Sequence, residues 1–441
     1  MNWSKRLLLV IVFIGLVALF THNFLHNIFQ LGEPKDPNRF KPRVFEDFQM
    51  DTQGSINSTL EKMKRDGLWS SYGLIYGYPK PDDLYDRAFA LHAKLYGWLY
   101  INSTLDLHQF VEKGYFWVSL IFAIVLASFA IFIYREFGIG AFLAFVILIN
   151  LSDWLVFVGR NMYHVYFLRF WPAVASMLFF RYVVKEKIKL AYFLLIIGLS
   201  LLILALCCNE FITNVVLATG VGPVYYGVLY RKGWKQIFRW VFITVFIAGI
   251  AVAIGIAAIC IQNYLYYKDW SKALIVIHAI INRAYGTYDT THDWTAPPEI
   301  SVFQIFEQYL TLPMLSFPFA QNMFPFYHIV LSLYACIVII FPLTFLSLLD
   351  EKYFPKIVTE RTKLLALTAA TWYALASSLS WAFLMKGHMW HHIHMAGMIF
   401  YLPYLPFMYI LLGKHFGWLL VQFRDWVENN SWPWLDHKES S

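Results

Sequence analysis

Hydrophobic residues occur along this chain in long runs that are separated by shorter polar segments. Ten runs are about 20 residues long, enough for a helix to cross the ~30 Å hydrocarbon core of a bilayer. They cover 7–27, 115–134, 139–158, 165–184, 190–208, 211–230, 240–265, 326–349, 364–385 and 395–413. They lack the alternation of barrel strands, and backbone groups cannot stay unpaired in lipid. The pattern predicts an all-α polytopic membrane protein with about ten transmembrane helices.

The composition supports this fold class. Of 441 residues, 59% are hydrophobic, 19% are aromatic and only 14% are charged. This balance excludes an ordinary soluble protein. The formal charge of +7 arises from basic loops between the runs, so it gives no reason to expect nucleic acid. The four cysteines, which include the adjacent pair Cys207 and Cys208, have neither the spacing of a disulfide framework nor that of a CxxC motif.

Lysine and arginine predict the orientation, because cytoplasmic loops are enriched in them. Placing the N-terminus inside, with Lys5 and Arg6, puts the other basic clusters on the same side. These are Arg135; Arg181, Lys185, Lys187 and Lys189; Arg231, Lys232, Lys235 and Arg239; Lys352, Lys356, Arg361 and Lys363; and Lys414. The short opposite loops carry only Arg160 and Lys386. We therefore expect both termini in the cytoplasm and the chain in an inner or plasma membrane.

This topology places two long segments on the non-cytoplasmic side, with predicted amphipathic helices at 54–66, 83–101, 271–284 and 301–312. The chain then divides into a transmembrane anchor (1–27), an outer loop with amphipathic helices (28–114), transmembrane helices two to seven (115–265), a second outer loop (266–325), transmembrane helices eight to ten (326–413) and a cytoplasmic interfacial tail (414–441). The first run is read as an uncleaved anchor because no small-x-small cleavage site follows it.

A histidine cluster lies in KGHMWHHIHMAG, residues 386–397, with His388, His391, His392 and His394. A di-iron desaturase centre is disfavoured, because the other histidines lack the spacing of the further boxes that it needs. Three interpretations remain open: a mononuclear divalent metal site, aromatic packing at the headgroup interface, or hydrogen bonding to a substrate phosphate. The sequence requires no cofactor.

Further ionisable residues gather near the outer ends of the predicted helices. Asp153 and Arg169 flank the turn GRNMYHVY, and an ion pair between them is sterically feasible. Arg160 and His164 lie in or next to the same turn. Other candidates on this side are Glu210, Arg283 and Lys386. Such a rim suits a lipid phosphate, which needs cationic or imidazole donors.

The layout as a whole resembles the GT-C superfamily of polyprenyl-phosphate-sugar glycosyltransferases. The similar features are an inside N-terminus, a first helix followed by a long acidic outer loop, about ten spans and a second long outer loop. The stretch RNMYHVYFLRFWP, and GHMWHHIH before YLPYLPF, also resemble bacterial integral membrane proteins of that class. The chain lacks the acidic pair directly after the first helix that marks protein mannosyltransferases.

The resemblance implies sugar transfer from a polyprenyl-phosphate donor to a glycan, lipid or protein acceptor on the non-cytoplasmic face. The base would be an acid in the first outer loop, and the matching residues are Asp51 in FQMDTQ and, second, Asp47 in VFEDF. The donor phosphate would be bound by residues from the rim and the histidine cluster. These are Arg160, His164, Arg169, Glu210, Arg283, Lys386, His388, His391, His392 and His394.

Two other classes of function remain. A transporter or lipid flippase would use Asp153 and Arg169 as pathway residues and would use glycines and prolines as helix breaks. These are Gly220, Gly222, Pro223, Pro403 and Pro406. A structural or assembly protein would need none of this chemistry. The transferase is favoured because the polar residues gather at one face and the two halves of the chain are not similar.

Overall fold

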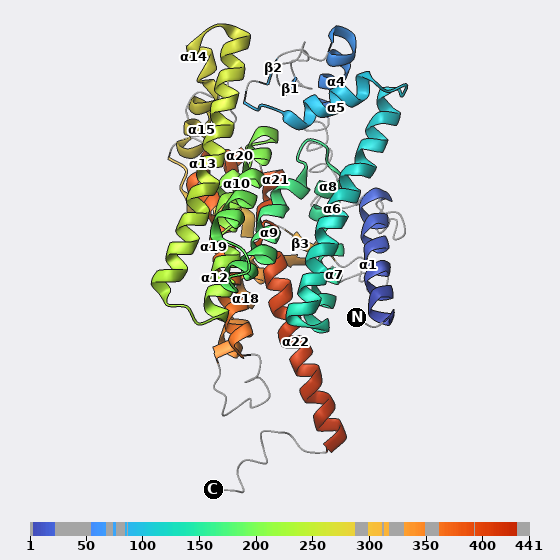
Figure 1. Ribbon diagram of the computed structural model, residues 1–441, viewed down its shortest axis with the longest axis vertical. Helices are drawn as coiled ribbons and strands as arrows, with labels where there is room; N and C mark the ends of the chain where they lie inside the picture. Colours follow the sequence, from blue (N-terminus) through green and yellow to red (C-terminus); the bar gives the residue numbers. More distant parts are fainter. Residues whose placement is uncertain are drawn as a thin grey trace.

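The computed structural model describes residues 3–22, 54–67, 74–75, 84–85, 87–286, 299–310, 313–316, 330–348, 361–391 and 393–429. In these ranges the chain is almost entirely helical, and the long helices form one bundle along a common axis (Figure 1). Two small antiparallel sheets complete it. They pair β1 (Leu74–Ile75) with β2 (Leu84–Tyr85) and β3 (Pro313–Ser316) with β4 (Val330–Ser332).

Among the described residues, six helices are long and apolar enough to cross a membrane. They are α6 (Leu107–Phe137), α9 (Tyr166–Val184), α10 (Leu190–Cys207), the pair α11 (Ile212–Ala218) and α12 (Val221–Leu229), α13 (Trp234–Tyr267), and the first part of α22 (Tyr404–Asn429). Together with the outward-facing apolar side chains along them, these helices confirm the prediction of a multi-pass helical membrane protein.

The other predicted runs also contain helices. They are α1 (Trp3–His22), α7 (Ile139–Asn150), α8 (Asp153–Arg160), α18 (Leu333–Leu348), α19 (Arg361–Leu384) and α21 (Ile393–Phe400). The short helix α20 (Lys386–His391) lies between the predicted runs 364–385 and 395–413. The predicted continuous run 139–158 is wrong in one respect, because it divides into α7 and α8. Ser152 begins the second helix, and its hydroxyl accepts a 3.2 Å hydrogen bond from the N–H of Leu155, which is the geometry of an N-cap.

Two further helix breaks lie inside predicted runs. At both breaks, side chains from other helices donate hydrogen bonds to backbone carbonyls. Between α11 and α12, the carbonyl of Thr219 accepts a hydrogen bond from Ser176 of α9. In the last turn of α21, before the break to α22, the carbonyls of Met398 and Ile399 accept 2.9 Å hydrogen bonds from Tyr166 of α9 and Asn214 of α11. Irregular backbone at membrane depth is tolerated where protein groups satisfy it in this way.

Small residues bring α7 and α22 into close contact. A Cβ placed on Gly413 would lie 2.5 Å from Cβ of Ala144 and 2.6 Å from the carbonyl oxygen of Gly140. Gly413 and Gly417 lie one helical turn apart, and both face Gly140. This is the small-xxx-small pattern by which membrane helices pack closely, since lipid offers no hydrophobic drive for their association.

At one end of the bundle, α4 (Gly54–Asp66), α5 (Leu91–Ile101) and the β1–β2 sheet gather near α14 (Trp270–Ala273) and the end of α13 (Figure 1). We call this the α5 end. Two further short helices, α15 (Ile275–Tyr285) and α16 (Val302–Leu310), correspond to predicted amphipathic segments. The range of α4 is the predicted one, and its apolar residues Ile56, Leu60 and Met63 are fully buried.

The predicted helix 83–101 is shorter in the structure. Leu84 and Tyr85 belong to β2, and α5 begins only at Leu91 because Ala90 has a φ of +57°, which an α-helix cannot include. Leu95 and Trp98 are about half exposed on the outer side of α5. On the inner side, Lys94 donates a 2.5 Å hydrogen bond to Gln262 of α13 and thereby fixes α5 to the bundle.

Candidate functional site

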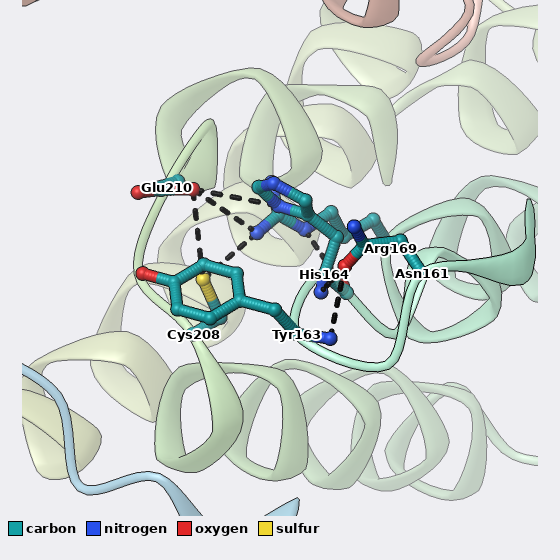
Figure 2. Close-up of polar contacts among 6 residues, drawn as sticks. All are labelled: Asn161, Tyr163, His164, Arg169, Cys208 and Glu210. Carbon is teal, nitrogen blue, oxygen red and sulfur yellow. Dashed lines mark hydrogen bonds and ion pairs between the residues drawn. The ribbon is translucent and has the colours of Figure 1, made fainter. Parts of the chain in front are cut away.

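Four side chains form a buried polar cluster beneath the α5 end, and we call it the Arg169 cluster. It consists of His164, Arg169, Cys208 and Glu210, and Figure 2 shows the four side chains converging from two turns and from the start of α9. Nη2 of Arg169 lies 2.8 Å from Sγ of Cys208 and 3.7 Å from Oε2 of Glu210. The same carboxylate oxygen lies 3.4 Å from Nδ1 of His164 and 3.9 Å from Sγ of Cys208.

The first of the two turns connects α8 to α9. Asn161 organises this turn, because its Oδ1 accepts 2.9 Å hydrogen bonds from the N–H groups of both Tyr163 and His164 (Figure 2). Val165 follows with a φ of +40°, an unfavourable conformation for a β-branched residue. Strained backbone of this kind persists only where the surrounding structure enforces it, and it is concentrated at functional sites.

The second turn connects α10 to α11 and carries Cys208 and Glu210. Phe211 ends it, also in the left-handed region with a φ of +59°. The ring of Phe211 lies 5.0 Å from the guanidinium carbon of Arg169, in the range of a cation–π contact. Nε of Arg169 donates a 3.2 Å hydrogen bond to the carbonyl of His164 and so joins the two turns. A fully buried guanidinium requires such partners.

His92 of α5 packs beside the turn that carries His164. Its ring packs edge-on against Tyr96 and Tyr163, and within the described part of the chain neither ring nitrogen has a hydrogen-bond partner. Burial lowers the pKa of His92 to about 3, and the positive charges of Arg169 and Lys94 act in the same direction. His92 is therefore neutral at physiological pH.

A cavity of about 750 Å³ lies at the α5 end of α6, and we call it the α6 cavity. Its lining residues are Asn57, Leu107, His108, Val111, Glu112, Tyr115, Phe116 and Arg160. The guanidinium of Arg160 lies 5.8 Å from the ring of Tyr115. Nδ1 of His108 and Oε1 of Glu112 are 3.9 Å apart, one helical turn from each other. A cation, an imidazole, a carboxylate and apolar side chains thus share one cavity.

The α6 cavity and the Arg169 cluster belong to one local structure. Arg160 is the last residue of α8, and Asn161, which organises the turn into the cluster, follows it directly. The position of the Arg160 side chain in the cavity therefore depends on the turn that the cluster holds in place.

The structure brings together three of the predicted site residues, namely His164, Arg169 and Glu210. Arg160 ends α8, directly before the turn that carries His164, and lines the α6 cavity. Arg169 pairs with Glu210. The side chain of Asp153 lies outside those described, so its predicted pair with Arg169 stays a prediction. Cys208 was not predicted as a site residue. The only sequence signal for it is its position between a hydrophobic run and Glu210.

Lys386 and His388 belong to α20, which packs on the end of α15, and the charge of Arg283 on α15 acts on Cys208 of the Arg169 cluster. A Cβ on Gly387 would lie 2.9 Å from the carbonyl of Asn282 and 3.0 Å from that of Arg283, so α20 packs directly on the end of α15. His388 is buried with its ring edge-on to Trp381. Lys386 donates a 3.3 Å hydrogen bond to the carbonyl of Ile300.

The remaining predicted residues lie partly or wholly outside the described structure. His391 and His394 are placed only as backbone positions in α20 and α21. His392, Asp47 and Asp51 are outside the described residues.

The described residues offer two places where a ligand could bind. The Arg169 cluster holds an imidazole, a thiol and a carboxylate whose ligand atoms all lie within 4.8 Å of one another, a set that could hold a metal ion. The α6 cavity offers a cation beside apolar surface. Neither the protein-family models nor the curated proteins with which the chain was compared match it.

Proposed function

We propose that this protein is a membrane-embedded glycosyltransferase of the GT-C type, which moves a sugar from a polyprenyl-phosphate donor to an acceptor on the non-cytoplasmic face. The α6 cavity carries this proposal, because it combines the groups that a lipid-linked phosphate needs. Arg160 supplies the fixed positive charge for the phosphate, and His108 and Asn57 supply further hydrogen-bond donors.

The apolar wall of the α6 cavity suits the lipid part of such a donor. Phe116 lines the cavity and is 41% exposed, and its ring packs edge-on against the still more exposed Trp117. Ile121 and Ile124 continue the exposed apolar face of α6 away from the α5 end. A polyprenyl chain that leaves the cavity past Phe116 would therefore remain on apolar surface along α6.

In the proposed reaction the acceptor hydroxyl gives its proton to the carboxylate of Asp51, with Asp47 as the second candidate. The acceptor oxygen bonds to the anomeric carbon while the bond from that carbon to the phosphate oxygen breaks. The electron pair leaves on the polyprenyl phosphate, whose charge Arg160 stabilises, and the transition state has oxocarbenium character. In the sequence, Asp51 is three residues before the start of α4, whose Asn57 lines the cavity.

The proposed topology has ten spans, with both termini in the cytoplasm and the α5 end facing outward. The beginning of α1 and the end of α22 both lie toward the end of the bundle opposite α5, which supports termini on one side (Figure 1).

The proposal is tested with the full chain purified in detergent, by native mass spectrometry for co-purified lipid and by transfer assays with polyprenyl-phosphate sugars. The substitution Arg160→Gln should weaken retention of polyprenyl phosphate about 10- to 100-fold, because it removes one charge-assisted contact with the phosphate. Arg135→Gln is the matched control, because Arg135 is exposed at the opposite end of α6. Equal retention by wild type and both variants, together with no transfer, would contradict the proposal.

A further inference from the structure

The ligand atoms of His164, Cys208 and Glu210 in the Arg169 cluster lie close to the mutual distances of a metal site. A tetrahedral zinc ion with bonds of about 2.0 Å to nitrogen or oxygen and 2.3 Å to sulfur holds neighbouring ligand atoms about 3.3–3.7 Å apart. Nδ1 of His164 lies 3.4 Å from Oε2 of Glu210, and Sγ of Cys208 lies 3.9 Å from the same oxygen. The third pair, the ligand atoms of His164 and Cys208, lies within 4.8 Å, so a small contraction of the cluster would place the three atoms around one ion.

The chemistry of the ligand set indicates the kind of ion. Thiolate and imidazole ligands select zinc and similar transition metals, whereas magnesium and calcium prefer sites made of oxygen atoms. A neutral His164, an ionised Cys208 and an ionised Glu210 contribute two negative charges, which a divalent ion balances.

Arg169 has a role outside the first ligand shell of such an ion. Its Nη2 lies 2.8 Å from Sγ of Cys208, so Arg169 would contact one ligand of the ion from outside the coordination shell. Its Nε remains bonded to the carbonyl of His164, and its guanidinium remains against Phe211. With Arg169 counted, the site would have one net positive charge, which favours an anionic fourth ligand such as hydroxide.

We propose that His164, Cys208 and Glu210 bind one thiophilic divalent metal ion, zinc in the first instance, and that this ion joins the turn between α8 and α9 to the turn between α10 and α11. This site is separate from the α6 cavity, and the inference does not depend on the transfer reaction. Because the first turn begins next to Arg160, the ion would also fix the cavity's cation in position.

The first test uses the wild-type chain, purified in detergent and loaded with zinc. We expect one zinc ion per chain by elemental analysis and, by X-ray absorption, one sulfur at about 2.3 Å with nitrogen and oxygen neighbours at about 2.0–2.1 Å. A zinc environment without sulfur would place the ion elsewhere and overturn the proposal, as would the absence of stoichiometric zinc.

The second test identifies the ligands by titration with Co(II), whose bond to a thiolate gives a charge-transfer absorption. Cys208→Ser should abolish this absorption, and Glu210→Gln should weaken Co(II) affinity at least about tenfold. Cys336→Ser is the matched control, because Cys336 is also a buried thiol but belongs to α18. Charge-transfer absorption that survives in a folded Cys208→Ser variant would overturn the assignment. If that variant does not fold, the wild-type sulfur distance still decides the question.

Discussion

The hydroxyl of Tyr225 donates a 3.0 Å hydrogen bond to the buried carboxylate of Glu136, at the end of the bundle opposite α5. Arg181 approaches the other carboxylate oxygen at 3.7 Å, and Lys363 donates a 3.3 Å hydrogen bond to the backbone carbonyl of Glu136. Cations next to the last carbonyls of a helix also interact favourably with its dipole. One acidic residue thus connects the end of α6 to α9, α12 and α19.

We expect Glu136→Ala to destabilise the folded protein by about 1–3 kcal/mol, because Tyr225 then loses its acceptor in a buried position. Tyr225→Phe should lower the free energy of unfolding by about 1 kcal/mol, because Arg181 still forms an ion pair with the Glu136 carboxylate. Thermal unfolding in detergent measures both. The control is Glu186→Gln, an exposed site where a change within about 0.5 kcal/mol is expected. Equal stability of all three variants would show that the Glu136 contacts contribute nothing.

Gly413→Leu should separate α7 from α22, because its side chain would occupy the space of Ala144 and of the Gly140 carbonyl. We expect a large loss of folded, monodisperse protein in size-exclusion chromatography. Gly249→Leu is the matched control, since a Cβ on Gly249 meets no atom within 4 Å. Similar yields of the two variants would mean that the close approach at Gly413 is not required.

Asn161→Ala should loosen the turn that carries His164, because one side-chain oxygen accepts hydrogen bonds from two buried backbone N–H groups. The free energy of unfolding should fall by about 1–3 kcal/mol. Hydrogen exchange of the peptide that covers 160–166 should rise. Asn102→Ala, at an exposed asparagine, provides the comparison and should leave this peptide unchanged. Unaltered exchange in Asn161→Ala would show that backbone contacts alone hold the turn.

Acidification should open α5. The pKa of His92 is about 3 in the folded protein and about 6.5 when the ring is in water, so the open form binds more protons below pH 6.5. The stabilisation by neutral His92 is complete above pH 6.5 and is lost as the pH falls toward 3. Between pH 7.5 and pH 5 the loss is about 2 kcal/mol.

This pH effect is measured as hydrogen exchange of the α5 peptide at both pH values, corrected for the intrinsic pH dependence of exchange. His92→Leu should remove most of the difference between the two values. If His92→Leu retains the full pH dependence, another group is responsible for it.

The positions of the helices could be predicted from the sequence, because an apolar run of spanning length satisfies its backbone in lipid only as a helix. The breaks at Leu151 and Thr219 could not, since they depend on capping by Ser152 and on Ser176 of a different helix. Prolines and glycines indicated where a break was permitted. They did not indicate which neighbours would satisfy the freed carbonyls.

The candidate site was predicted in part for a similar reason. Ionisable residues near helix ends are rare and costly, so Arg169, His164 and Glu210 were recognisable individually. The choice of Glu210 as the partner of Arg169 depends on how α9 packs against α10, and periodicity does not contain that information. Cys208 was missed because a buried thiol in an apolar region usually serves as a small hydrophobic residue.

The break between α21 and α22 has a consequence for motion. Met398 and Ile399 are held by α9 and α11 through Tyr166 and Asn214, as described above, and Ser378 of α19 donates a 3.4 Å hydrogen bond to the carbonyl of Leu402. Bending at this break would require three helices to release their hydrogen bonds at the same time. We therefore expect this break to behave as a rigid joint and not as a hinge. A ligand of the α6 cavity would then enter and leave at the α5 end while α9, α11, α19 and α22 keep their relative positions.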